Sequence, residues 1–220
     1  MILQDRSVLV IIDMQKVSLT DGLYPVYNVD NLVNKIKKVI DVCRQANFPV
    51  VFTRHIYRVS GVDATPLEFQ EAGFPVCAKG SVSAEIIDEL KFEPQDIVVD
   101  KSRWNAFYGS DLKIVLKGLG VRNLIFCGVF TDACVRETVF DAFYRGFSIV
   151  LIKDCCGCHN SDIHKANVLD MANWVYGITI FSADEFAKYL KGENYKAWQW
   201  EKPNSVPYTK STLDRLYDSV

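Results

Sequence analysis

The sequence lacks the features of a membrane protein, an exported protein and a nucleic-acid-binding protein. No apolar run reaches the roughly 18 residues that a membrane-spanning helix needs. The start of the chain, MILQDRSVLVIID, has no basic region followed by an apolar run and a cleavage site, so it predicts a first strand rather than a signal peptide. The formal net charge is −2, which gives no basic surface for nucleic acid.

The cysteine content also argues against a disulfide-stapled protein. Seven cysteines are an odd number, and a chain without a recognisable export signal is not expected to build a complete disulfide framework. The chain has 220 residues and 49% hydrophobic content, enough to bury one full core. We therefore expect a reduced, cytoplasmic globular protein that binds neither nucleic acid nor membrane.

Apolar runs and helical patterns alternate along most of the chain. The β-branched run SVLVII at residues 7–12 is typical of a buried strand, whereas residues 29–46 repeat apolar side chains at helical spacing. Similar patterns predict strands at residues 49–55, 96–100, 123–129, 147–154 and 178–181, and helices at residues 82–90, 111–120, 131–145, 161–174 and 183–190. Residues 60–80 contain glycine and proline and predict a loop.

This alternation predicts the fold class. Strands that alternate with helices favour right-handed βαβ units, a mostly parallel sheet and helices on both faces. We therefore predict an α/β fold with three αβα layers and a doubly wound sheet, in one domain over residues 1–190.

Residues 191–220 break the alternation. The segment NYKAWQWEKPNSVPYTK is rich in aromatic residues and contains two prolines. Two interpretations remain open: a tail that packs on its own domain, or an arm that reaches a neighbouring subunit, since exposed tryptophans favour interfaces. The second interpretation goes with a homo-oligomer, a dimer or a tetramer.

Three chemically complementary residues lie at the carboxyl ends of predicted strands. Asp13 follows the first strand, Lys101 the third, and Cys134 comes just after the fourth. In open α/β sheets the ligand site lies beyond these strand ends. A helix N-terminus and a nearby cation both lower a thiol pKa, and a carboxylate can accept the thiol proton and later activate water. The trio therefore predicts nucleophilic catalysis by a thiol.

Each of these residues also has a purely structural interpretation. Cysteine is often buried as a small hydrophobic residue, and a polar residue after a strand is often a cap or part of a turn. Thr131 is a candidate N-cap, which would place Cys134 in the first helical turn, where free N–H groups can stabilise an oxyanion. The match of all three residue types to one mechanism favours the catalytic interpretation.

Three segments resemble the isochorismatase-like cysteine hydrolase superfamily, which includes nicotinamidases, carbamoylsarcosine amidases, and ureidoacrylate and biuret hydrolases. They are VLVIIDMQ at residues 8–15, KSRWNAF at residues 101–107 and GVFTDACVRETVFDAFYRGF at residues 128–147. The resemblance spans roughly residues 5–190. It implies that Asp13 is the general base, that Lys101 stabilises the thiolate and developing charge, and that Cys134 is the nucleophile.

The resemblance also implies the geometry of the turn and the type of reaction. It places a non-proline cis peptide at Val129–Phe130 and an oxyanion hole at the backbone N–H groups of Phe130 and Cys134. The expected activity is hydrolysis of a C–N bond in a small amide, carbamoyl or ureido compound through a thioester, with release of ammonia or an amine. The alternatives are a vinyl-ether hydrolase of the isochorismatase type, against which Cys134 argues, and a non-catalytic small-molecule-binding protein.

One departure from the family pattern concerns metal. Nicotinamidases hold a divalent metal with an Asp-x-His motif after the second strand and a further histidine, but here the stretch is TRH, with Thr53 at the aspartate position. His55 remains and is either a substrate-facing group or a structural one. A site with one obvious ligand does not suit a metal, so we expect no metal and no other cofactor.

Other residues near the motifs are candidate substrate contacts: His55, Tyr57, Arg58, Trp104, Asn105 and Phe107. Aromatic walls with a few polar points suit a small planar amide. Trp104 is equally compatible with the core. Arg58 is either a solvated loop charge or an anchor for a carboxylate or a second carbonyl.

The stretch CCGCH at residues 155–159 matches the pattern for covalent haem attachment. Haem attachment needs export and an exposed segment, whereas this stretch directly follows a core strand. A redox pair of Cys155 and Cys158 and a partial metal site are further alternatives. The favoured interpretation is a turn of small residues between a strand and a helix.

Overall fold

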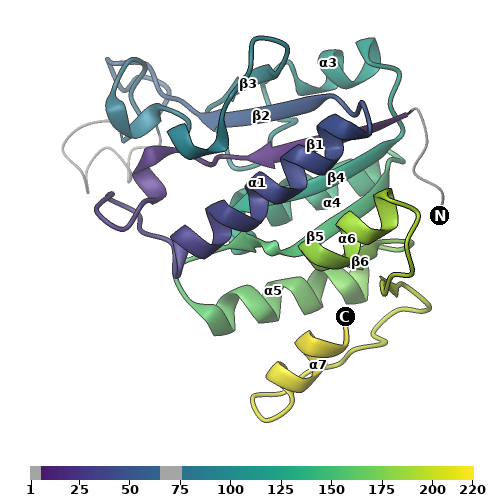
Figure 1. The fold of residues 1–220 in the computed structure, drawn as a ribbon. Coiled ribbons are helices and arrows are strands. Elements are labelled where there is room, and N and C mark those ends of the chain that lie inside the picture. Colours follow the sequence, from purple (N-terminus) through teal and green to yellow (C-terminus); the bar gives the residue numbers. More distant parts are fainter. Residues whose placement is uncertain (1–5, 65–75) are drawn as a thin grey trace.

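The computed structural model describes residues 6–64 and 76–220, and within them one seven-stranded sheet runs through the molecule (Figure 1). The strand order is β3-β2-β1-β4-β5-β6-β7. Neighbouring strands from β3 to β6 are parallel, and only β7 pairs in the antiparallel sense. The strands are Ser7–Ile12 (β1), Val50–His55 (β2), Ile97–Lys101 (β3), Asn123–Val129 (β4), Ser148–Gly157 (β5), Thr179–Phe181 (β6) and Trp198–Gln199 (β7).

Helices cover both faces of the sheet. On one face lie α1 (Val29–Gln45) and α6 (Ala183–Leu190), and on the other lie α3 (Leu112–Gly118), α4 (Arg136–Tyr144) and α5 (Ser161–Trp174) (Figure 1). β1 shows how the sequence builds two cores: Leu9 and Ile11 pack toward α1, whereas Val8, Val10 and Ile12 pack toward the other layer. The predicted three-layer αβα fold is confirmed.

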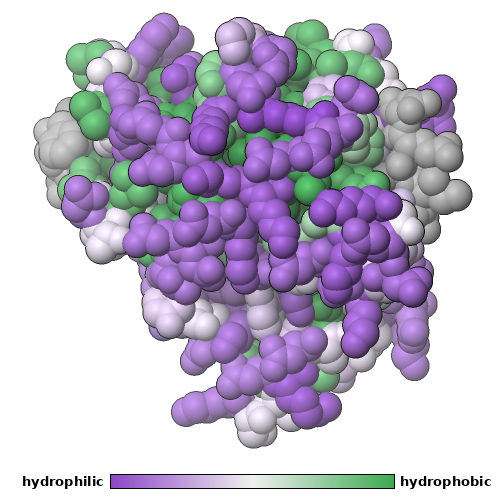
Figure 2. Space-filling model, viewed as in Figure 1, coloured by the Kyte–Doolittle hydropathy of each residue, from purple (hydrophilic) through white to green (hydrophobic). Residues whose placement is uncertain are grey.

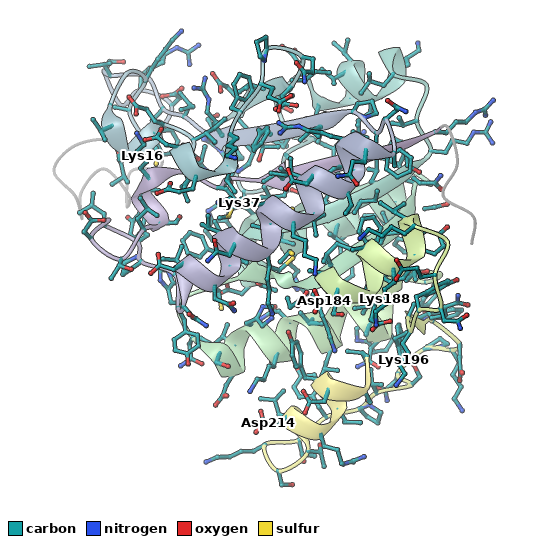
Figure 3. All side chains as sticks on the ribbon, in the orientation of Figure 1. Lys16, Lys37, Asp184, Lys188, Lys196 and Asp214 are labelled. Atoms are coloured by element: carbon teal, nitrogen blue, oxygen red, sulfur yellow. The ribbon has the colours of Figure 1, made fainter. Side chains whose placement is uncertain are left out.

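The outer face of α1 and α6 is polar. Hydrophilic side chains cover most of this face (Figure 2). Asp184 and Lys188 project from the outer side of α6 (Figure 3), and an ion pair between Lys38 and Asp184 links the two helices. Across the described residues, no helix is both long enough and apolar enough to cross a membrane.

Residues 82–90 differ from the prediction because their backbone bonds a tertiary partner. Residues 82–90 contain two separate 3-10 turns, Val82–Ala84 and Asp88–Leu90, instead of one helix. Between them the Ile87 N–H donates to the Met14 carbonyl in the loop after β1. This N–H is therefore not available for a helical hydrogen bond. Of the predicted loop at residues 60–80, residues 60–64 and 76–80 contain no helix or strand, and residues 65–75 lie outside the described residues.

The helix after β4 also starts differently. A π-helical turn, Thr131–Val135, precedes α4, and Thr131 is not its N-cap. The Thr131 hydroxyl instead forms a 2.8 Å hydrogen bond with His164 of α5. The prediction of a Thr131 cap was therefore wrong, because a long-range partner takes this hydroxyl.

The segment after α6 lies against its own domain. β7 pairs with β6, and the terminal helix α7 (Leu213–Ser219) packs on α5. Trp198, Trp200 and Val206 contact the core between the sheet and α5. These contacts correspond to the first interpretation of residues 191–220, a tail that packs on its own domain.

Gly128 allows β1 and β4 to approach closely beside the predicted site. It has a φ of +115° and pairs with Ile12, the residue before Asp13. A Cβ atom at position 128 would lie 2.1 Å from the Ile12 carbonyl oxygen. Backbone cannot move aside as a flexible side chain can, so only glycine fits here.

Gly128→Ala is therefore expected to lower the free energy of unfolding by about 3 kcal/mol or more, from overpacking and backbone strain together. Gly120→Ala is the matched control, because Gly120 has a φ of +63° but nothing within 4 Å of its Cβ position. The control should lose about 1 kcal/mol. Urea unfolding of both variants measures the difference, and equal losses would contradict the close-approach argument.

Candidate active site

The three strand-end residues of the predicted trio lie in contact at the carboxyl edge of the sheet. The Lys101 ammonium is 2.5 Å from Asp13 Oδ2 and donates to Cys134 Sγ at 3.4 Å. All three residues are buried, with exposed fractions of 5% for Asp13, 2% for Lys101 and 5% for Cys134. They stand where the strand order reverses, between β1 and its neighbours β2 and β4.

Asp13 is oriented by the strand next to it. The residue has a positive φ of 49°, which turns the chain just after β1. The Thr53 hydroxyl on β2 donates to Asp13 Oδ1 at 2.6 Å, and the Asp13 N–H donates to the same hydroxyl at 3.2 Å. Thr53, the residue that departs from the metal-binding pattern, therefore fixes one oxygen of the carboxylate and leaves the other to Lys101.

Lys101 has acceptors besides the trio. Its ammonium donates to the Arg103 carbonyl at 3.0 Å, and it lies 3.5 Å from His55 Nδ1. The His55 backbone is held by Gln15, whose side-chain oxygen accepts from the His55 N–H at 2.7 Å. These contacts limit where the ammonium can lie, so it stays between the carboxylate and the sulfur.

Cys134 lies within the π-helical turn after β4. The peptide bond Val129–Phe130 is cis, and the Phe130 carbonyl accepts from the N–H groups of Ala133 and Val135. The Thr138 hydroxyl donates to the Cys134 carbonyl at 2.6 Å and accepts from Ala106 at 3.0 Å. The two N–H groups of the predicted oxyanion hole thus belong to the cis peptide, at Phe130, and to this turn, at Cys134.

The environment opposes ionisation of the resting thiol. Burial, and after it the negative charge of Asp13, raises the pKa of Cys134, and this outweighs the lowering by Lys101. Burial lowers the pKa of Lys101, but the neighbouring Asp13 and Cys134 raise it by more. Asp13 and Lys101 therefore act on the pKa of the thiol in opposite directions.

A cavity of about 420 Å³ opens onto the trio, and most of its wall is apolar or aromatic. Of the trio, Asp13 and Cys134 line this cavity. The described residues that line the remainder are Gln15, Val17, Ser18, Tyr24, His55, Tyr57, Val76, Cys77, Trp104, Phe130, Asp132, Ala133 and His159.

Three of the six candidate substrate contacts line this cavity. His55 and Tyr57 pack edge to face, with their ring centroids 4.7 Å apart. Trp104 lies at the wall with 57% of its surface exposed, so it is not a core residue. His55 therefore faces both the cavity and Lys101.

The other three candidates are not among the described residues that line the cavity. Arg58 is largely exposed and pairs with Asp63 at 2.9 Å. Asn105 donates to Asp141 at 2.7 Å and its side-chain oxygen accepts from the Phe107 N–H. Phe107 is buried in the core behind the sheet. Proximity in sequence to the motifs did not determine where these side chains point.

Sequence reasoning missed Tyr24 and His159 as parts of the cavity wall. The His159 ring stacks on Phe130 with centroids 4.6 Å apart, and Tyr24 meets it edge-on at 6.5 Å. The position of His159 just beyond the carboxyl end of β5 was the available signal. The other residues of CCGCH serve packing, because Cys155, Cys156 and Cys158 are free and buried.

Comparison with known proteins agrees with this fold. The family model for the isochorismatase domain matches residues 7–194. The ureidoacrylate amidohydrolase of Rhizobium rhizogenes (strain K84 / ATCC BAA-868) is 28% identical over 203 residues, which cover 81% of this chain and 82% of that protein. The chain therefore belongs to the isochorismatase family.

Of two further relatives, one is named as a probable inactive protein and the other as an amidase. An Arabidopsis thaliana protein named as a probable inactive nicotinamidase is 32% identical over 175 residues, covering 76% of this chain and 89% of that protein. The crystal structure of N-carbamoylsarcosine amidase from Thermoplasma acidophilum superimposes with a TM-score of 0.69 at 28% identity, covering 82% of this chain and 98% of that chain.

The charges around the thiol lead to opposite expectations for two substitutions. Lys101→Met removes the cation that favours the thiolate, so alkylation of Cys134 by iodoacetamide at neutral pH should slow about tenfold or more. Asp13→Asn removes the anion that opposes the thiolate, so alkylation should become faster.

Mass spectrometry of the Cys134 peptide, at several pH values, follows both reactions. Lys113→Met, at an exposed position on α3, is the control and should match the unmodified chain. If both site variants shift the rate in the same direction, the charge assignment is wrong.

Proposed function

We propose that the chain is a cysteine-dependent amidohydrolase that cleaves a C–N bond in a small amide, carbamoyl or ureido compound. The observation that carries this proposal is the buried Lys101 ammonium in contact with both the Asp13 carboxylate and the Cys134 sulfur. Hydrolysis of non-peptide C–N bonds also agrees with the names of the ureidoacrylate and carbamoylsarcosine relatives.

The first half of the reaction forms a thioester. Asp13 accepts the thiol proton while Cys134 Sγ attacks the substrate carbonyl carbon, and the carbonyl electron pair moves to the oxygen. The N–H groups of Phe130 and Cys134 bind this oxyanion. Asp13 then gives its proton to the departing nitrogen, the C–N bond breaks, and ammonia or an amine leaves.

The second half releases the acid. Asp13 takes a proton from water, whose oxygen attacks the thioester carbonyl carbon. When the tetrahedral intermediate collapses, the C–S bond breaks and Cys134 recovers the proton from Asp13. Lys101 remains an ammonium throughout and balances whichever negative charge, on Asp13 or on sulfur, is present at each stage.

The same residues do not suit a metal. The ligand atoms of Asp13, His55 and Cys134 lie within 4.8 Å of one another. However, the Lys101 ammonium already contacts the carboxylate and the sulfur, and a second cation there would meet its repulsion. Thr53 uses its hydroxyl to hold Asp13 where a metal-binding family member would have a carboxylate.

The cavity favours a substrate without a carboxylate group. No lysine or arginine occurs among the described lining residues, and Asp132 adds a negative charge to the wall. The rings of Tyr24, His55, Tyr57, Trp104, Phe130 and His159 provide flat apolar contacts instead. We therefore assign an uncharged planar amide or ureide as the substrate class.

An ammonia-release screen tests the function. It pairs carboxylated compounds, such as maleamate and N-carbamoylglycine, with their uncharged amides, and it includes nicotinamide and biuret. An uncharged compound should have the highest kcat/KM, and Cys134→Ala should lose at least about a thousandfold in kcat. Intact-mass measurement during turnover should find an acyl adduct that Cys134→Ala lacks.

Other results of the screen would contradict separate parts of the proposed function. Preference for a carboxylated substrate would contradict the substrate class but not the hydrolase. Turnover that survives Cys134→Ala would refute the covalent mechanism and favour vinyl-ether-type hydrolysis without a nucleophilic thiol. Stabilisation against heat by an amide that is never hydrolysed would favour the binding-protein alternative, which the inactive relative keeps relevant.

Activity is expected to survive prolonged dialysis against a strong chelator, because Lys101 occupies the space between the potential ligands. The assay compares dialysed protein with and without added zinc, manganese or iron. Loss of activity that one of these ions restores would overturn the metal-independent mechanism. Thr53→Val is a companion variant that should lower kcat, because it frees Asp13 to move, and added metal should not restore it.

A further inference from the structure

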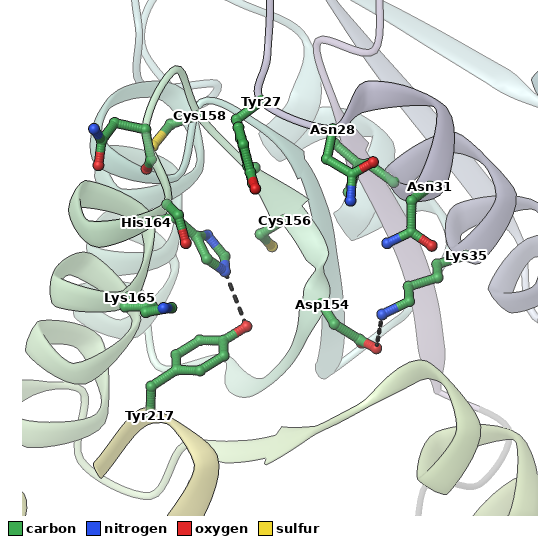
Figure 4. A pocket seen from close by; sticks show the side chains of 14 residues that line it. Tyr27, Asn28, Asn31, Lys35, Asp154, Cys156, Cys158, His164, Lys165 and Tyr217 are labelled. Atoms are coloured by element: carbon green, nitrogen blue, oxygen red, sulfur yellow. Dashed lines mark hydrogen bonds and ion pairs between the residues drawn. The ribbon is translucent and has the colours of Figure 1, made fainter. Parts of the chain in front are cut away.

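A hydrogen-bonded chain connects the turn that carries Cys134 to the C-terminal helix. The hydroxyl of Thr131, the first residue of the turn, lies 2.8 Å from His164 Nδ1 on α5. The other ring nitrogen, His164 Nε2, lies 3.0 Å from the Tyr217 hydroxyl on α7 (Figure 4). These two hydrogen bonds thus link the turn after β4 to α5, and α5 to α7.

We propose that His164 and Tyr217 are positioning residues, which act through Thr131 to hold Cys134 in its reactive place. The C-terminal tail thereby becomes part of the support of the active site. The proposal assumes the nucleophilic role of Cys134 that the proposed function gives it. The family match ends at residue 194, so Tyr217 belongs to a part of the chain that the family model does not include.

The protonation states suit such a chain. Burial lowers the pKa of His164 to about 4, so at neutral pH the ring is uncharged and has one N–H donor and one acceptor nitrogen. Burial also raises the pKa of Tyr217, which keeps the phenol protonated. Each hydroxyl can donate or accept, so a complete chain forms with either tautomer of His164.

Tyr217 is itself held firmly by the domain. Its ring meets the His164 ring edge-on with centroids 5.4 Å apart. The Lys153 ammonium lies 4.7 Å from the Tyr217 ring centroid and donates to the Tyr217 carbonyl at 2.7 Å. An ion pair of 2.6 Å between Lys165 and Asp214 also joins α7 to α5, but Asp214 is largely exposed, so this pair contributes little to the position of Tyr217. The hydroxyl therefore meets His164 from a fixed position.

At its other end, the hydrogen-bonded chain affects the position of Cys134 through Thr131. Thr131 is fully buried and lies three residues before Cys134 in the same π-helical turn. The turn also contains the Cys134 N–H, and Phe130 directly precedes Thr131. A displaced Thr131 would shift both the sulfur relative to Lys101 and the oxyanion donors. Loss of the hydrogen-bonded chain should therefore slow the chemical step and leave substrate affinity unchanged.

Tyr217→Phe removes only the hydroxyl and keeps the ring contacts. We expect kcat and the rate of Cys134 alkylation to fall about threefold to tenfold, the effect of one lost hydrogen bond, with KM unchanged. Thr131→Val should produce the same loss, and the double variant should lose no more than either single one.

Two control variants distinguish the effect of the hydrogen-bonded chain from a general effect of how the C-terminal tail packs on the domain. Tyr208→Phe makes the same change at a partly exposed tail tyrosine, and Asp214→Asn breaks the ion pair but leaves the chain in place. Both should keep the rates of the unmodified protein. Loosening of the whole fold would instead speed alkylation of the buried Cys127 and Cys155, which the same mass spectra report.

Unchanged alkylation in Tyr217→Phe, or an equal loss in Asp214→Asn, would overturn the proposal. Alkylation needs no substrate, so this test does not depend on finding the hydrolysed compound. If Tyr217→Phe slows alkylation while the screen finds no turnover, the positioning role stands and the proposed hydrolase fails.

Discussion

The buried ammonium of Lys101 is the constraint on which the site depends. An ammonium with 2% exposure is costly to desolvate unless negative and polar groups surround it, and removal of one partner from such a pair costs about 3–5 kcal/mol. Asp13, Cys134 and the Arg103 carbonyl supply those groups. They come from the residue after β1, the turn after β4 and the loop after β3, so the strand order is what makes the contact possible.

The surrounding structure holds these partners in place. Gly128 lets β4 pair with Ile12 at the end of β1, and Thr53 on β2 fixes the Asp13 carboxylate. All of these residues lie within residues 7–194, the part of the chain that the family model matches. Residues beyond 194 add contacts of their own, since β7 extends the sheet and α7 packs on α5.

The layers of the fold and the trio at the strand ends could both be predicted from local patterns in the sequence. Buried β-branched runs and helical repeats are local signals, so segments such as residues 7–12, 161–174 and 183–190 are observed as expected. The carboxyl ends of parallel strands meet at one edge of a sheet, and this rule alone predicts that Asp13, Lys101 and Cys134 lie close together.

Which side chains face the cavity could not be predicted from the sequence, because contacts between distant segments set their directions. Arg58, Asn105 and Phe107 lie near the motifs, but ion pairing, an amide hydrogen bond and core packing turn them elsewhere. Residues 24 and 159, and the chain from residue 131 to residue 217, meet across long sequence separations. Such contacts depend on how elements far apart in the sequence pack together, and no local pattern of residues encodes that packing.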